Sequence, residues 1–310
     1  MYHRCRKICF ALTFFAILVP TVAAQQSVQP VVPAATQAHP GIDASAPADA
    51  KETIRRALEV DQRNLALARN YTYEEKQETR AFDKRGSTKH QQSETHDLTI
   101  LYGEPYSRLI QKNGKPLSEK DEKKEQEKLD KFIAKHKNES EKEKQKRLAK
   151  MEKDRREERA FAGDIINAYD FRMAGQEQVD GRDVYVIEAN PRKDFHPTQP
   201  HADVLPKLRG RVWIDKKDYD WVKIEAESID TISWGLFLAR IHKGSHFSFE
   251  QTRVNDEIWL PRRISINASA RFALLLNGGF DFESSYSNYK KFVASGRVLP
   301  GITEVEPAKK

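Results

Sequence analysis

The chain has 310 residues, of which 38% are hydrophobic and 32% are charged, and its formal net charge is +7. This composition accommodates one ordinary domain together with an unusually polar region. A charge this modest is unlike that of a dedicated nucleic-acid binder. Both cysteines, Cys5 and Cys9, lie at the N-terminus, so a chain processed beyond them has no disulfide, thiolate metal site or cysteine nucleophile.

The first 24 residues have the pattern of a secretory signal peptide. Three basic residues precede an apolar stretch from Ile8 to Val19, and the small residues Val22, Ala23 and Ala24 follow. The apolar stretch is shorter than the ~20 residues that span a bilayer. We therefore predict cleavage after Ala24, which removes three positive charges and lowers the net charge from +7 to +4. The mature product is expected to be soluble and periplasmic or otherwise exported.

A flexible leader and an amphipathic helix are predicted next. Residues 25–47 are rich in Pro, Ala, Gln and Ser and have no apolar period, which is typical of a leader. From about Asp49 to Arg69, apolar residues such as Ile54 and Leu58 recur on one helical face, and Asp49 is placed to cap the helix. Such a helix requires a sheet against which to pack.

Most of the remaining chain alternates with the period of β-strands. Because the connections are too short for crossover helices, the sheet is predicted to be mainly antiparallel. Asn113-Gly114 and Asn277-Gly278-Gly279 are strong hairpin signals. Strands are expected at 71–82, 93–102, 106–111, 184–189, 209–214, 221–227, 236–241, 247–252, 258–261, 264–270, 272–276 and 280–286.

The clearest hairpin spans residues 208–227, with a polar turn at 215–220. In its second strand Val222, Ile224 and Ala226 alternate with charged residues, which predicts one apolar and one polar sheet face. The amphipathic helix and an element near residue 165 are expected to cover only part of the apolar face. A curved sheet whose apolar face is incompletely filled leaves a cavity for an apolar ligand.

Residues 118–158 form a highly charged arm, with 13 acidic and 15 basic residues among 41. Helix propensity is high, so two helices are predicted at about 118–136 and 140–162, in line or as a hairpin. Ser118 and Ser140 are placed to cap them. The arm is either a solvated insertion or a helix that binds a partner or a membrane surface. Charges of both signs interleave along the sequence, which favours the solvated insertion.

No sequence motif assembles a catalytic or cofactor site. The pairs His196 with His201 and His242 with His246 provide only two ligands each, so no metal site is predicted. The three aspartates of the turn at 215–220 lack EF-hand spacing and have lysines between them, which favours a plain hairpin turn. We expect neither a cofactor nor enzymatic activity, and no nucleic-acid partner.

Two segments carry a resemblance to a known family: GRDVYVIEANP at 181–191 and LRGRVWIDKKDYDWVKIEAES at 208–228. With the signal peptide, the N-terminal helix and the meander of strands, they resemble the periplasmic lipoprotein-carrier superfamily of outer-membrane lipoprotein-sorting proteins, typified by LolA and LolB. The resemblance implies a half-open β-barrel whose concave face, covered by helices, holds acyl chains. The charged arm departs from that pattern, and no ligand-gripping residue is carried over.

The predicted fold class is therefore α+β, a strongly curved antiparallel sheet with helices over its concave face. One domain at 48–292 is interrupted by the arm at about 118–162, and a tail covers 293–310. The leading hypothesis is a carrier of acyl chains or lipoproteins; the alternative is an envelope sensor that recruits a protein partner through 118–158, with peripheral membrane contact left open. Candidate cavity residues are Tyr185, Ile187, Val212, Ile214, Val222, Ile224, Ile264, Ile266, Phe280 and Phe282.

Overall fold

A computed structural model describes residues 49–234, 239–272 and 276–291. The predicted signal peptide, leader and C-terminal tail lie outside these ranges. The helical elements are α2 (Ala50–Leu67), η1 (Ala68–Asn70), α3 (Glu119–Lys137), α4 (Glu141–Ala168) and η2 (Ala202–Lys207). The strands are β1 (Tyr71–Phe82), β2 (Thr88–Leu101), β3 (Glu104–Lys112), β4 (Lys115–Pro116), β5 (Tyr169–Val179), β6 (Arg182–Pro191), β7 (Leu208–Asp215), β8 (Trp221–Ser228), β9 (Ile232–Trp234), β10 (Ala239–Ile241), β11 (His246–Val254), β12 (Ile258–Phe272) and β13 (Leu276–Lys291).

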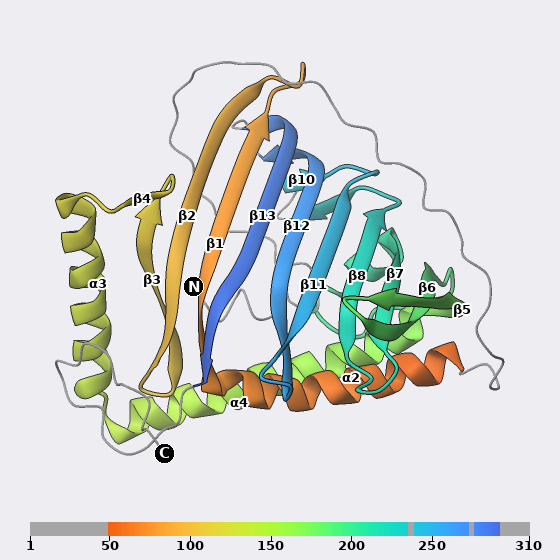
Figure 1. Cartoon of the computed structure of the whole chain (residues 1–310), viewed down its shortest axis with the longest axis horizontal. Coiled ribbons are helices and arrows are strands. Elements are labelled where there is room, and N and C mark those ends of the chain that lie inside the picture. The colour runs from red at the N-terminus through yellow and green to blue at the C-terminus, as the bar shows by residue number, and fades with distance from the viewer. Residues whose placement is uncertain (1–48, 235–238, 273–275, 292–310) are drawn as a thin grey trace.

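All 13 strands belong to one antiparallel sheet that curves but does not close (Figure 1). Its order is β4-β3-β2-β1-β13-β12-β11-β8-β7-β6-β5, and the small pair β9 and β10 joins at β12. The pairing of β1 with β13 brings the first strand of the described chain beside its last one. The predicted α+β class and the open antiparallel sheet are confirmed.

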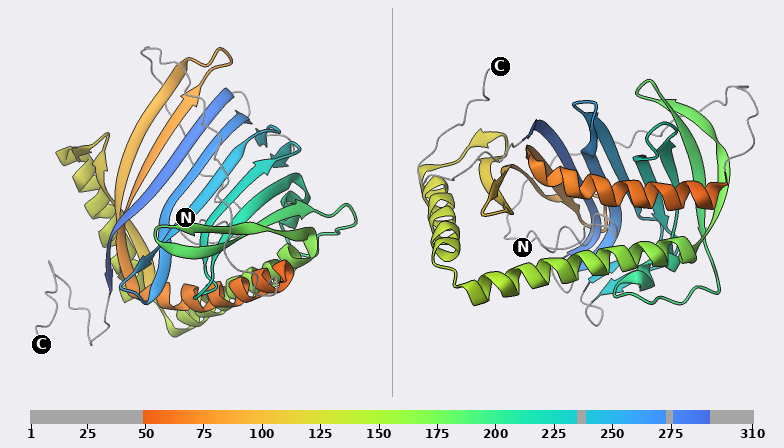
Figure 2. Two further views of the ribbon diagram at one scale, coloured as in Figure 1. Left: turned by 45° about the vertical axis from the view of Figure 1, so that its right-hand side comes forward. Right: turned by 90° about the horizontal axis from the view of Figure 1, so that it is seen from below.

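Helix α2 lies across the ends of the strands and packs on one face of the sheet (Figures 1 and 2). Its N-cap is Asp49, as predicted, which accepts a hydrogen bond from the backbone of Lys51 at 3.0 Å. The buried side of α2, with Ile54 and Leu58, packs against Ile187, Val212, Ile214 and Trp221 of β6 to β8. We call this side of the sheet the helix face.

A second core forms farther along the helix face. Val204 of η2, Ile232 of β9 and Ile241 of β10 pack against Phe247 of β11 and Ile266 of β12. The short strands β9 and β10 therefore fold over the main sheet and add to the cover that α2 provides. Two separate cores thus fill much of the apolar side on which the sequence places a cavity.

The charged arm forms two helices, as predicted, but they are neither in line nor a hairpin. They meet at a corner, so that α3 runs along the β3 and β4 edge while α4 crosses beneath the sheet (Figures 1 and 2). Ser140 and Glu143 form the predicted capping box at the start of α4. The physical reason for the corner is tertiary, because Phe132 of α3 packs on Tyr106 of β3 with ring centroids 4.9 Å apart.

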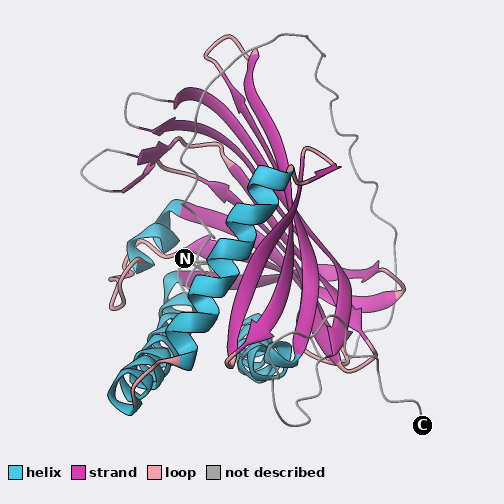
Figure 3. Cartoon of the chain, turned by 90° about the vertical axis from the view of Figure 1, so that its left-hand side faces the viewer, coloured by secondary structure: helices cyan, strands magenta, loops and turns pink. Residues whose placement is uncertain are grey.

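Helix α4 continues to Ala168, beyond its predicted end near residue 162. Only its last turns pack on the body, where Phe161 and Ala168 contact η2 and Ala162 joins the α2 core. In Figure 3 the helices lie along the edge and across the lower end of the fan of strands. None of the described helices is both long and apolar enough to cross a lipid bilayer.

The predicted hairpin turn at Asn277-Gly278-Gly279 is wrong. These residues belong to β13, where Gly278 lies opposite Ala270 of β12. A Cβ atom at Gly278 would come within 2.0 Å of the backbone oxygen of Phe82, so the glycine permits a close approach of two backbones. The predicted strands 258–261 and 264–270 are likewise one strand, β12.

Candidate functional site

Nine of the ten candidate cavity residues lie on the helix face, as their alternation and their packing show. The exception is Val222, which packs with Trp213 and Trp259 on the opposite face. Its prediction failed because a register irregularity in the β7 and β8 pair sets Ile214 opposite Trp221 and Trp213 opposite Lys223. One additional residue in β8 therefore turns Val222 away from Ile224.

Burial divides these nine residues into two groups. Ile187, Val212, Ile214, Ile264 and Ile266 are buried in the protein core. By contrast Tyr185, Ile224, Phe280 and Phe282 are only half-buried. The first group is core and leaves no room for a ligand, whereas the second is still accessible from solvent.

Half-buried apolar side chains also lie on the helix face, where Ile224 packs against the α2 core and Phe282 against the β9 and β10 core. In β8 and β11, Ile224 lies opposite Phe249; in β13, the rings of Phe280 and Phe282 lie parallel with centroids 6.5 Å apart. We call Ile224, Phe249, Phe280 and Phe282 the apolar strip. Phe249 was not among the sequence candidates, although its alternation within the predicted strand 247–252 could have revealed it.

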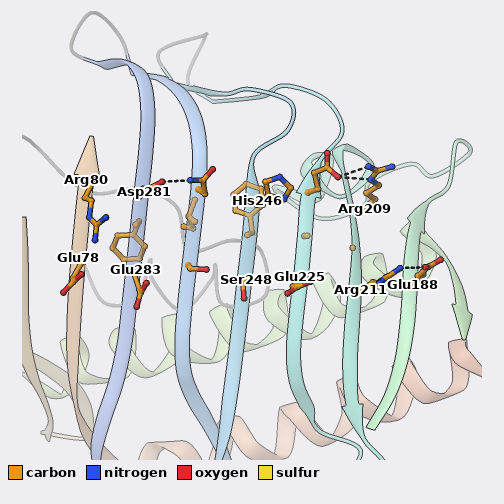
Figure 4. A pocket seen from close by; sticks show the side chains of 18 of the residues that line it. Glu78, Arg80, Glu188, Arg209, Arg211, Glu225, His246, Ser248, Asp281 and Glu283 are labelled. Carbon is orange, nitrogen blue, oxygen red and sulfur yellow. Dashed lines mark hydrogen bonds and ion pairs between the residues drawn. The ribbon is translucent and has the colours of Figure 1, made fainter. Parts of the chain in front are cut away.

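The opposite face of the sheet carries a hollow of about 770 Å³, lined by residues of β1, β6, β7, β8, β11, β12 and β13 (Figure 4). Because side chains alternate, the residues that neighbour the apolar ones in sequence project here, two from each strand. One row crosses β1, β13, β12, β11, β8, β7 and β6 through Arg80, Asp281, Asn267, His246, Glu227, Arg209 and Asn190. The second row contains Glu78, Glu283, Ser265, Ser248, Glu225, Arg211 and Glu188.

Ion pairs between strands satisfy most charges of this polar hollow. Arg209 donates to Glu227 at 2.8 Å, and Glu188 accepts from both Arg211 at 3.0 Å and Arg172 at 2.5 Å. The two arginines lower the pKa of Glu188 through these hydrogen bonds. Cross-strand pairs of opposite charge stabilise an exposed sheet surface. The polar hollow is therefore a solvated network of ion pairs. The sequence predicted no site at these residues.

A further cluster of charged side chains lies at the turn between β7 and β8. Arg182 donates to both carboxylate oxygens of Asp215, at 2.5 and 3.0 Å, and to Asp218 at 2.7 Å. Burial works to raise the pKa of Asp215, but the hydrogen bonds from Arg182 and from the backbone outweigh it and leave this pKa lowered. Arg253, near the end of β11, also binds Asp218. The aspartates of the hairpin turn thus join it to the ends of β6 and β11, and the predicted turn between the two strands is confirmed.

Within the described residues no group of three or more His, Cys, Asp or Glu side chains is arranged to hold a metal ion. The apolar strip offers contact area without polar groups, and most charges of the polar hollow are paired. The fold and its surfaces define an open, curved antiparallel sheet with a partly covered apolar face.

Several solved structures are similar to this chain. A DUF1329 family protein from Desulfovibrio piger has 12% sequence identity and a TM-score of 0.31, covering 80% of this chain and 95% of that one. An outer-membrane lipoprotein-sorting protein domain from Vibrio parahaemolyticus has 14% identity and a TM-score of 0.27, covering 81% and 95%. A LolA superfamily protein from Nitrosomonas europaea has 15% identity and a TM-score of 0.26, covering 82% and 96%.

The last two proteins carry the names of the superfamily that residues 181–191 and 208–228 resemble. At these identities and TM-scores the similarities carry no argument about what this chain binds. No protein-family model matches the chain, and no curated protein matches it by sequence. The case for a function therefore rests on the chain's own residues.

Proposed function

We propose that this protein is an exported, non-enzymatic binding protein that holds an acyl chain or another hydrophobic moiety against the apolar strip. The observation that carries the proposal is the half-burial of Ile224, Phe249, Phe280 and Phe282 on the helix face. Large exposed apolar patches on soluble proteins mark binding sites, and these four side chains share one face of the sheet. Ile224 packs against the α2 core and Phe282 against the β9 and β10 core, which fixes the positions of these two side chains.

Apolar contact alone supplies enough affinity for such a ligand. Each buried methylene contributes about 0.8 kcal/mol, so a chain of about ten methylenes gains several kcal/mol before the cost of ordering it. The strip itself contributes no charged group, so the free energy of binding is expected to depend on chain length. Short fatty acids should bind more weakly than long ones.

Titration with a fluorescent long-chain fatty acid tests the proposal. Replacing Phe249 and Phe280 by serine removes two ring surfaces from the strip and should weaken binding at least tenfold. The matched control is Ser248→Ala, because Ser248 neighbours Phe249 in sequence but projects into the polar hollow. If wild-type protein does not bind the probe, or if the control loses as much affinity as the double variant, the proposal fails. Native mass spectrometry after mild extraction provides an independent search for bound lipid.

The alternative, an envelope interaction protein that recruits a partner through residues 118–158, makes a different prediction. Deleting the arm should then abolish partner capture while fatty-acid binding, if present, survives. Because Phe132 of α3 packs on Tyr106, the deletion variant should carry Tyr106→Ser to avoid a new apolar surface. Retained lipid binding in that variant supports the carrier proposal.

A further inference from the structure

Helix α4 contains a long segment without a buried side chain among its described residues. Between Glu141 and Ala160 none of the described side chains is buried, although the helix continues unbroken into its packed C-terminal turns. In Figure 2 this segment extends beneath the sheet from the corner with α3 toward β5. It is held in place at the corner by Arg147, which donates to Glu139 at 2.8 Å and to Glu104 at 3.1 Å.

Five of the nine basic residues of this segment fall on one side of the helix, where Glu157 is the one acidic residue among the same positions. At 3.6 residues per turn, Lys142, Lys146, Lys150, Lys153 and Arg156 fall within about a third of the circumference. All five are exposed. They extend over about 21 Å, given a rise of 1.5 Å per residue. Charges that interleave along the sequence are thus sorted by the helix into a basic stripe, which the sequence order concealed.

Few carboxylates neutralise this basic stripe. Lys153 lies 3.8 Å from Glu157, whereas no ion pair within the described residues involves Lys142, Lys146 or Lys150. Like charges four residues apart, such as those of Lys142 and Lys146, repel each other and weaken an isolated helix. The capping box at Ser140 compensates part of that loss. A polyanionic surface would relieve the repulsion by adding opposite charge along the whole stripe.

We propose that the basic stripe docks the protein on an anionic phospholipid surface. A protein partner would require an apolar or aromatic centre at the contact, and the stripe has none because Leu148 lies on another side of the helix. Lysines attracted to a charged bilayer need no such centre, since their contribution is electrostatic and additive. The absence of an apolar face on this segment means that the helix lies on the headgroups without insertion. This inference does not depend on acyl-chain binding by the apolar strip.

Co-sedimentation with vesicles tests this proposal. The full exported chain is mixed either with vesicles of phosphatidylcholine alone or with vesicles in which about 30% of the lipid is the anionic phosphatidylglycerol. The stripe variant carries Lys142→Gln, Lys146→Gln, Lys150→Gln, Lys153→Gln and Arg156→Gln. Gln keeps a comparable helix propensity, and circular dichroism checks that helicity is retained. Its binding to anionic vesicles should fall at least tenfold, since each cation near such a surface contributes about fivefold.

The matched control removes the same charge from the exposed side of α3 through Lys120→Gln, Lys123→Gln, Lys131→Gln, Lys135→Gln and Lys137→Gln. It should bind anionic vesicles like the wild type, and raising the salt concentration should release both. Equal losses in the two variants would show that net charge and not the stripe governs binding, which overturns the proposal. The proposal is also overturned if the wild-type protein does not bind anionic vesicles, even if the stripe variant no longer binds an acidic protein partner. Fatty-acid titration of the same variants separates this outcome from failure of the proposed function.

Discussion

Replacing Asp220 by asparagine is expected to stabilise the protein above neutral pH. Asp220 is only 1% exposed, and its Oδ1 accepts the backbone N–H of Trp221 at 2.9 Å. Its Oδ2 has no hydrogen-bond partner among the described residues. Burial, assisted by the nearby carboxylates of Asp218 and Asp215, raises the pKa of Asp220 from 3.8 to about 7.

The size and sign of the effect follow from this pKa. A rise of about three units corresponds to about 4 kcal/mol, because each unit is worth 1.36 kcal/mol. The native state prefers the protonated carboxyl, so the stabilisation is complete below pH 4 and is lost as the pH rises through about 7. Asparagine is permanently neutral and avoids that loss. An unpaired amide in place of Oδ2 costs roughly 1 to 3 kcal/mol, which leaves a net gain of about 1 to 3 kcal/mol at pH 8.

Urea unfolding followed by circular dichroism from about pH 3 to about pH 8.5 measures this difference. The matched comparison is Asp215→Asn in the same turn, which should have the opposite effect because the Arg182 hydrogen bonds lower the pKa of Asp215. Neutralising Asp215 should therefore destabilise the protein at neutral pH and lose this penalty as the pH falls below about 4. If Asp220→Asn is less stable than the wild type at pH 8 and its pH profile is unchanged, the reasoning about the buried carboxyl is wrong.

Four other substitutions probe the fold. Gly278→Ala should lower the stability by about 2 kcal/mol or more, as in an overpacked core, because the added Cβ meets the backbone of Phe82. Gly163→Ala, on the exposed side of α4, should instead raise the stability by up to about 1 kcal/mol. Thermal melts compare the two variants. Ser140→Ala should remove about 1 kcal/mol from α4, seen as lower helicity, and unchanged helicity would contradict the role of the capping box. Phe132→Ala should free α3 from β3, and hydrogen exchange in α3 that stays as slow as in the wild type would refute its anchoring role.

Local chemistry made the helices and most strands predictable. The cap at Asp49, the capping box at Ser140 and the alternation within β7 are all short-range features, and each is present in the structure. The same alternation identified nine of ten residues on the helix face. It failed at Val222, because one additional residue in β8 reverses the side to which a strand residue projects.

The pairing of strands that are far apart in the chain could not be predicted from the sequence. Asn277-Gly278-Gly279 has the local chemistry of a turn, yet it lies within a strand because the approach of Phe82 demands glycine there. The cover that β9 and β10 give to the helix face was equally hidden, since Ile232 and Ile241 come from short strands with weak patterns. For this reason the sequence placed a cavity where much of the face is packed core.

By itself, then, the sequence determined most of the secondary structure, the sidedness of most strand residues and the polarity of the arm, because these depend on neighbours within a few residues. Only the tertiary structure decided which apolar residues are filled core and which, such as Phe249 and Phe280, remain half-open to a ligand. It also decided that α3 and α4 meet at a corner, leaving the basic side of α4 exposed. Both outcomes depend on contacts between segments far apart in the chain, and a linear pattern does not encode these distances.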